Sequence, residues 1–248
     1  MRDEHLVYGR NPVLALLRER ARRTDEVAVL SGAAGPLSEV VALARRAGVK
    51  VSYRTRDQLT AIAGSPHHQG VVARVASAEY VDLSALERIP SERAETPFFL
   101  ALDQVQDPRN LGALLRTADA FGVHGVIVPK HRQVGVTAAA ARTAMGAVES
   151  VPITRETNLV GALETLKKSG VWIYGAVADG GVPAWGADLS GPLCLVLGGE
   201  GEGLRPVVVR ACDILLSIPM SGRVGSLNVA AAGAVLCYEI CRQRAARA

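Results

Sequence analysis

Three short stretches of the sequence combine glycines with polar side chains that could do chemistry. They are LDQVQDPRNLGALLRTA (residues 102–118), LVLGGEGEGLRP (195–206) and SIPMSGRVGSLN (217–228). Each begins in an apolar run of the kind that forms a buried strand. Because ligands of open parallel sheets bind at the carboxyl ends of the strands, these stretches are the first candidates for a binding or catalytic site.

The first stretch opens a predicted helix over residues 108–121 whose two faces differ in character. Its apolar stripe, at helical spacing, consists of Leu111, Leu114, Leu115, Ala118 and Phe121. The opposite face carries the small residues Gly112, Ala113 and Ala120 around Arg116. Small residues there indicate close approach by another backbone or by a ligand. Asn110 lies in the first turn, where backbone N–H groups favour anions. As alternatives, Asn110 simply caps the helix, and Arg116 pairs with Asp119.

The second stretch contains GGEGEG, which has the glycine density of a nucleotide-binding loop but not its spacing. The third position from Gly198 is Glu200 rather than glycine, and no Gly-Lys-Ser/Thr of a phosphate loop follows. Glycines let the backbone approach a ligand closely. The two carboxylates favour a cationic or hydroxyl-bearing ligand over pyrophosphate, although a flexible acidic turn is the alternative.

The third stretch also pairs glycines with small polar side chains, immediately before an apolar helix. Gly222, Gly225 and Ser226 precede Asn228, and the helix predicted from about residue 226 is rich in alanine. This polar opening fits either a ligand-binding loop or an ordinary helix N-cap at Ser226.

Alternating strand and helix patterns surround the three stretches and predict an α/β fold with two domains. Residues 1–76 predict a small N-terminal domain with strands at 5–9, 26–30, 49–54 and 70–76. Residues 77–97 are polar, contain two prolines and predict a linker. Residues 98–248 predict a larger domain, whose continuous Val, Leu and Ile runs indicate a parallel sheet covered by helices on both faces.

The composition narrows the possible function classes. Hydrophobic residues make up 49% of the 248 residues but aromatic ones only 4%, which favours an α/β protein over an aromatic-rich β-sandwich. The net charge is +4 and the pI about 9.0. Arginines cluster at Arg18, Arg20, Arg22 and Arg23, which is compatible with a phosphate-rich partner or with a solvated helix face.

Cysteine usage and the chain start predict a soluble, cytoplasmic protein. The 4 cysteines show neither a CxxC pair nor a zinc-ligand spacing, so we expect free thiols and no metal. The first residues, MRDEH, are charged and lack the apolar region of a signal peptide. No apolar run reaches the ~18 residues that a membrane helix needs.

Taken in order, the three stretches resemble one known set of motifs. DPRNLGALLRTADAFGV, LVLGGEGEGL and IPMSGRVGSLNVAAA resemble the signature motifs of the SpoU/TrmH branch of the SPOUT RNA 2′-O-methyltransferases. YGRNPVLALL (8–17) and HQGVVA (68–73) resemble the N-terminal substrate-binding domain of that branch. The resemblance is greatest to the bacterial members that methylate a guanosine ribose in 23S ribosomal RNA. It implies a catalytic domain with a deep trefoil knot and S-adenosylmethionine as the cofactor.

The resemblance also implies roles for individual residues of this sequence. The cofactor would be held by Gly198, Gly199, Ile218, Met220, Ser226 and Leu227. Arg116 matches the arginine proposed as general base in the family. Because arginine is essentially never neutral, stabilisation of a developing alkoxide is the alternative role. Asn110 and Asn228 would position the reacting groups, and Glu200 would orient them. Asn228 is followed by Val-Ala-Ala where many relatives carry a serine, a difference that we do not expect to abolish activity.

The family further implies a homodimer through the knotted domain, with no membrane or metal involved. RNA would contact the N-terminal domain, for which the candidates are Arg10, Arg18, Arg22 and His68. Three alternatives stay open: the same chemistry on tRNA, the same chemistry on another rRNA nucleotide, or a non-catalytic RNA-binding or ribosome-assembly protein. A nicotinamide-dependent oxidoreductase is disfavoured by the missing fingerprint.

Overall fold

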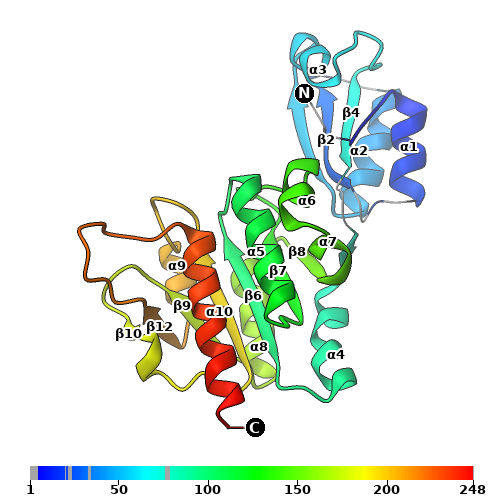
Figure 1. Cartoon of the computed structure of the whole chain (residues 1–248). Helices are drawn as coiled ribbons and strands as arrows, with labels where there is room; N and C mark the ends of the chain where they lie inside the picture. The colour runs from blue at the N-terminus through cyan, green and yellow to red at the C-terminus, as the bar shows by residue number, and fades with distance from the viewer. Residues whose placement is uncertain (1–4, 20, 22–23, 33–34, 76–78, 248) are drawn as a thin grey trace. The chain divides into compact units, whose positions relative to one another are not determined.

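The chain folds into two units, each with its own sheet (Figure 1). A computed structural model describes residues 5–19, 21, 24–32, 35–75 and 79–247. The first unit comprises Met1–Glu79 with Gly135–Ala138, and the second comprises Tyr80–Val134 with Ala139–Ala248. Among the described residues, no helix is long and apolar enough to cross a membrane.

The first unit is a four-stranded sheet covered on both faces. Its elements are β1 (His5–Tyr8), α1 (Arg10–Glu19), β2 (Thr24–Leu30), α2 (Pro36–Arg46), β3 (Lys50–Arg54), α3 (Arg56–Ala63) and β4 (Val71–Val75), with the strand order β1-β4-β2-β3. Helices α1 and α2 pack on one face, and the short α3 packs on the other through Leu59. A capping box between Thr55 and Gln58 opens α3, and Gly64 closes it in a left-handed conformation.

The second unit is built on an eight-stranded parallel sheet of order β10-β12-β9-β11-β6-β7-β8-β5. The strands are β5 (Tyr80–Val81), β6 (Phe98–Asp103), β7 (Gly125–Pro129), β8 (Ile153–Glu156), β9 (Trp172–Ala176), β10 (Val182–Pro183), β11 (Leu193–Gly198) and β12 (Ile214–Ser217). The central strands β6 and β7 are completely buried, which explains their uninterrupted apolar sequences.

Helices cover both faces of this sheet (Figure 1). They are α4 (Leu83–Arg93), α5 (Pro108–Ala120), α6 (Ala138–Ala144), α7 (Ala147–Ser150), α8 (Leu159–Lys168), the 3₁₀ helix η2 (Ala184–Gly186), α9 (Pro206–Val209) and α10 (Val229–Ala245). Helices α4, α8 and α9 share one buried cluster with the sheet. Helices α5 and α10 lie on the other face, where Gly233 of α10 brings its backbone against Leu114 and Leu197.

The predicted linker over residues 77–97 is wrong for most of its length. Strand β5 and helix α4 occupy it, and both belong to the second unit. Leu86 is completely buried, and its side chain fills the space beside Gly125, where a Cβ atom would lie 2.3 Å from Leu86 Cδ1. A few buried residues therefore hold this mostly polar helix against the sheet. So few apolar positions do not give a helical periodicity that can be recognised in the sequence.

Candidate active site

The three stretches meet at the carboxyl edge of the second unit's sheet. Strands β6 and β11 are neighbours, and their register pairs Gly198 with Asp103, so the first and second stretches leave the sheet side by side. The third stretch follows β12 and ends at α10, which packs over β11. The sheet order thus brings together segments about a hundred residues apart, as expected for a binding edge in a parallel sheet.

A chain of hydrogen bonds connects one polar side chain from each stretch. Asn228 Nδ2 donates to Asn110 Oδ1 at 3.1 Å. Asn110 Nδ2 in turn donates to the Glu200 carboxylate. Asn110 therefore has a partner on both sides of its amide, and it links the start of α5 to both loops.

Asn228 also begins the closing helix. Its Oδ1 accepts hydrogen bonds from the backbone N–H groups of Ala230 (2.9 Å) and Ala231 (3.4 Å). The helix α10 accordingly begins at Val229, and its N-cap is Asn228 rather than Ser226. Because the amide oxygen faces the helix, the amide nitrogen is turned towards Asn110, so the capping role and the linking role coexist in one side chain.

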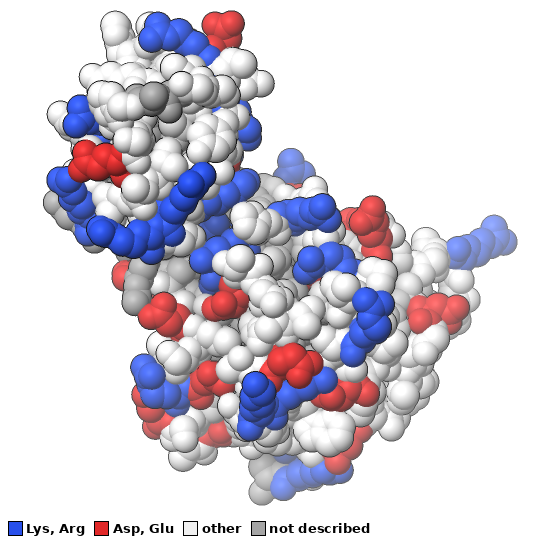
Figure 2. Space-filling model, turned by 180° about the vertical axis from the view of Figure 1, so that it is seen from behind, with Lys and Arg blue, Asp and Glu red and all other residues white. Residues whose placement is uncertain are grey.

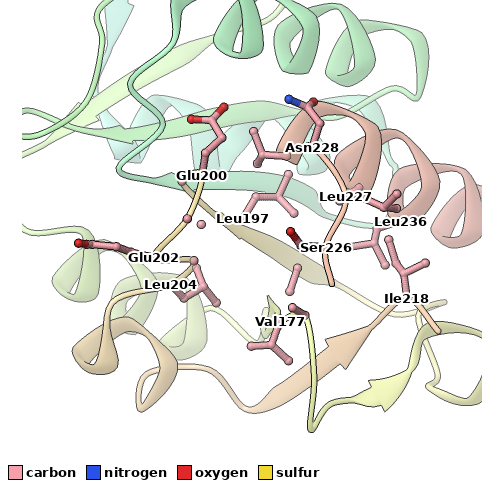
Figure 3. A pocket seen from close by; sticks show the side chains of 18 of the residues that line it. Val177, Leu197, Glu200, Glu202, Leu204, Ile218, Ser226, Leu227, Asn228 and Leu236 are labelled. Atoms are coloured by element: carbon pink, nitrogen blue, oxygen red, sulfur yellow. The ribbon is translucent and has the colours of Figure 1, made fainter. Parts of the chain in front are cut away.

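A cavity of about 490 Å³ lies between the second and third stretches. Its walls include every residue predicted to hold the cofactor: Gly198, Gly199, Ile218, Met220, Ser226 and Leu227. Figure 3 shows Glu200 and Asn228 at one rim, with Leu197, Leu227 and Leu236 around the interior. Glu202 points away from that rim (Figure 3). The cavity therefore joins an apolar interior to a polar rim.

The glycines at the cavity wall are required by the loops themselves. A Cβ atom on Gly198 would lie 2.1 Å from the carbonyl carbon of Gly203, and one on Gly199 would lie 2.2 Å from the carbonyl oxygen of Gln104. The loop also turns through Gly201 and Gly203, whose φ angles are +87° and +66°. Close packing of backbone on backbone thus explains the glycine density without reference to a ligand.

Two site residues that the sequence analysis missed, Asp103 and Arg205, hold this loop in place. The Asp103 side chain is fully buried at the end of β6. Its Oδ1 accepts from Arg205 Nε at 2.7 Å and pairs with Nη2 at 2.7 Å, while its Oδ2 accepts from the Arg205 backbone N–H at 2.9 Å. The Gly199 N–H donates to the Asp103 carbonyl oxygen at 2.8 Å. Asp103 thus fixes both ends of the glycine loop. A terminal Asp in the otherwise apolar run FFLALD was the signal in the sequence.

Arg116 lies on the exposed side of α5 and is not among the residues that line the cavity. In the part of the chain that the structure describes, its guanidinium has no ion-pair partner. Asp119, the partner considered from the sequence, instead accepts a hydrogen bond from Ser150 Oγ at 2.5 Å. The small-residue face is partly explained by α6, because a Cβ atom on Gly112 would lie 2.4 Å from the carbonyl oxygen of Ala140.

The candidates for RNA contact in the first unit are mostly paired or buried. Arg10 and Arg18 both pair with Glu39, at 3.8 and 2.8 Å, and Arg22 lies outside the described residues. His68 is 0% exposed, with its ring nitrogens bonded to Thr60 Oγ1 (3.2 Å) and the Gly70 N–H (3.0 Å). Burial, together with the Arg56 charge, lowers the pKa of His68, so its ring stays neutral. In this structure the His68 ring therefore offers no surface to RNA, and direct contact by His68 stays a prediction that the burial does not favour.

Charge is evenly distributed over much of the second unit. On its face shown in Figure 2, Lys and Arg side chains alternate with Asp and Glu, so neither sign dominates there. Among the described residues, no group of three or more His, Cys, Asp and Glu side chains is placed to hold a metal ion.

Comparisons with known proteins match both units. Residues 97–238 match the model of the SpoU rRNA Methylase family, and residues 6–81 match a model described as RNA 2′-O ribose methyltransferase substrate binding. A Shewanella oneidensis protein named 23S rRNA (guanosine-2′-O-)-methyltransferase RlmB is 41% identical over 98% of this chain and 99% of its own length. A Ralstonia nicotianae protein of the same name is 41% identical over 98% of both chains.

Solved structures of methyltransferases are also similar to this chain. The SpoU methyltransferase AviRb from Streptomyces viridochromogenes, in complex with the cofactor AdoMet, is 27% identical with a TM-score of 0.61, over 98% of this chain and 92% of that one. An AdoMet-bound rRNA methyltransferase from Sinorhizobium meliloti is 26% identical with a TM-score of 0.59, over 97% of this chain and 87% of that one. The likeness therefore covers both units.

Proposed function

We propose that this chain, which belongs to the SpoU rRNA methylase family, transfers a methyl group from S-adenosylmethionine to the ribose 2′-oxygen of a guanosine in 23S ribosomal RNA. The observation that carries the proposal is the hydrogen-bonded link from Asn228 through Asn110 to Glu200 at the rim of the cavity. It joins the three family motifs into one site.

The cavity fits the cofactor in size and chemistry. Its volume of about 490 Å³ lies within the range of small-molecule sites, which is roughly 300–1,000 Å³. The backbone around Gly198, Ile218 and Leu227 would hold the adenine and ribose against the apolar walls. When bound, S-adenosylmethionine supplies an electrophilic methyl group on a positively charged sulfur. Glu200, at the polar rim, provides the negative charge that such a group favours.

Arg116 has a role that follows from the weak acidity of a ribose hydroxyl. The 2′-oxygen gains negative charge as it attacks a methyl carbon, and a nearby cation stabilises that charge. Arg116 is exposed on the helix that also carries Asn110, and its charge is not neutralised by an ion pair within the described residues. We assign it this electrostatic role. A base role requires a group that would take the proton from arginine, and no described contact of this side chain supplies one.

The proposal includes the knot and the homodimer of the family. Family membership is the support for the knot. Support for the dimer comes from the outer face of α10, where Val235 is 45% and Tyr238 59% exposed. Tyr238 meets Phe121 of the α5 end edge-on, with ring centroids 6.5 Å apart. An apolar, aromatic surface of this kind is typical of an interface between subunits.

Methyl transfer with two RNA substrates tests the proposal. Both 23S rRNA and tRNA are prepared from cells that lack the protein and are incubated with the full chain and methyl-labelled S-adenosylmethionine. We expect label in 23S rRNA, as a 2′-O-methyl group at one guanosine. Label in tRNA alone would support the alternative substrate. If the chain binds RNA but labels neither substrate, it is a non-catalytic binding protein.

A further inference from the structure

A group of basic side chains lies beside the site, on the side away from the cavity. Strand β7 is the neighbour of β6 opposite to β11, and its register with β6 pairs Ala101 with Ile127. The carboxyl end of β7 is therefore level with Asp103, about 4.8 Å away in the strand-to-strand direction. The chain that leaves β7 there reads Lys130-His131-Arg132.

This basic segment is anchored to the first motif. Val105, two residues after Asp103, donates its N–H to Gln133 Oε1 at 2.7 Å and accepts the N–H of Val134 at 3.1 Å. On its other side, the Lys130 N–H donates to the Glu156 carbonyl oxygen at 2.9 Å. Both ends of the segment are thus fixed at the sheet edge, and its side chains are presented from a defined backbone.

Helix α5 extends the basic group towards the reacting residues. Each helical residue turns by about 100°, so Arg109 and Arg116, seven positions apart, share one face. That face lies between the direction of Asn110, which meets Glu200, and the direction of Gly112, which packs on α6. Arg109 is exposed. Arg109 and Arg116 therefore lie between the Asn110–Glu200 link and helix α6, which follows β7.

The charges of this group are available to a ligand. Arg109, Lys130 and Arg132 have no ion-pair partner among the residues that the structure describes, whereas Arg10 and Arg18 of the first unit share Glu39. A site that acts on a ribose must also accommodate the phosphates on either side of it. Basic side chains without acidic partners are the groups that bind such phosphates.

We propose that Arg109, Lys130 and Arg132 form a phosphate-binding surface, here called the β7 basic surface, that holds the RNA strand next to the target ribose. The identity of the RNA that this surface binds rests on the proposed function. The surface assigns RNA contact to the second unit itself: the cavity lies on the β11 side of Asp103, and the RNA backbone enters from the β7 side.

The test compares two double variants of the full chain. Lys130→Ala/Arg132→Ala removes two charges from the β7 basic surface. Lys168→Ala/Arg210→Ala removes two exposed charges at the opposite, amino edge of the sheet, at the ends of α8 and α9. The Kd for 23S rRNA made by transcription is measured for both and for the unchanged chain, without cofactor and over a range of salt concentrations.

The first double variant should bind 23S rRNA about tenfold more weakly, and its slope of log Kd against log salt should fall by roughly 1.5. The KM for RNA should rise while kcat and the affinity for S-adenosylmethionine, measured by calorimetry, stay unchanged. The second variant should match the unchanged chain. Equal affinities and slopes for the two variants would overturn the proposal.

Two further outcomes distinguish an error in the β7 basic surface from an error in the proposed function. If the Lys130/Arg132 variant binds protein-free 23S rRNA normally but loses methylation of isolated ribosomal particles, the surface contacts a protein instead, and the proposal is wrong. If the unchanged chain binds 23S rRNA but transfers no methyl group, the proposed function fails. The comparison of RNA affinities still decides the β7 basic surface in that case.

Discussion

The amide oxygen of Asn110 accepts a hydrogen bond from Asn228, 118 residues further along the chain, at 3.1 Å. The amide nitrogen of Asn110 donates to Glu200. A single side chain in the first turn of α5 therefore sets the relative positions of the two loops that build the cavity. Small displacements of such a link change the geometry of the site without unfolding the protein.

Replacing Asn228 separates its two roles. Asn228→Ser keeps an N-cap acceptor but removes the Nδ2 donor, so we expect the free energy of unfolding to change by less than ~0.5 kcal/mol. Methyl transfer should fall about 100-fold because the link to Asn110 is lost. Asn228→Ala should lose the cap as well, at about 1 kcal/mol. Chemical unfolding and kinetic assays measure both effects, and a fully active Ser variant would show that the link is dispensable.

Arg116→Ala should reduce kcat by about 100-fold or more while the affinity for S-adenosylmethionine is kept. Arg116→Lys distinguishes the two possible roles through its pH profile. A lysine that acts as a cation loses activity as the pH rises through about 10, whereas a lysine that acts as a base gains activity there. We expect the loss. A rise in kcat with pH would assign Arg116 the base role.

Asp103→Asn should weaken the anchor of the glycine loop. It replaces a buried carboxylate that holds Arg205 by a neutral amide, and because Arg205 is partly exposed we expect a loss of about 2 kcal/mol in unfolding free energy. The affinity for S-adenosylmethionine should also fall. Asp213→Asn is the matched control, since Asp213 pairs with Lys167 at 2.9 Å away from the cavity. It should lose stability but keep cofactor affinity; equal losses of affinity would contradict the anchor.

The three motif stretches could be predicted from the sequence because each is a continuous segment whose residue types are unusual for its surroundings. The pairing of Asp103 with Arg205 could not, because it joins positions 102 residues apart, although Asp103 ends an otherwise apolar run. The glycines of the second stretch were found, and the structure adds a second reason for them. Their density predicted close approach to a ligand, and Gly198 and Gly199 also leave room for the backbone of Gly203 and Gln104.

The helix α4 shows a different limit of prediction from the sequence. Its buried contacts, through Leu86, are long-range, while its local sequence is polar and contains Pro90 inside the helix. Local propensity therefore favoured a linker, and tertiary packing decided otherwise. Asn228 was predicted as a motif residue, and in the structure it is also the N-cap of α10 in place of Ser226. Both roles fit one side chain because an amide has a donor and an acceptor that can serve different partners.

His68 should titrate below the ordinary histidine value of about 6.5, because burial and the Arg56 charge lower its pKa. Between the folded pKa and about 6.5, the unfolded chain binds more protons than the folded one. The stability contributed by the neutral ring is therefore present above about pH 6.5 and is lost as the pH falls towards the folded pKa. An NMR titration, with His68→Gln to assign the signal, measures the midpoint. A midpoint at or above 6.5 would contradict the buried, neutral ring.

Val235→Glu should convert the proposed dimer into a monomer. The substitution places a charge in the middle of the exposed apolar face of α10, and burying an unpaired carboxylate between two subunits costs several kcal/mol. Val207→Glu on α9 is the matched control, because Val207 is 46% exposed against 45% for Val235 but lies on a helix of the other sheet face. Sedimentation equilibrium should give twice the chain mass for the unchanged protein and for the control, and the single chain mass for Val235→Glu. A monomeric unchanged protein would refute the dimer, and a dimeric Val235→Glu variant would move the interface away from α10.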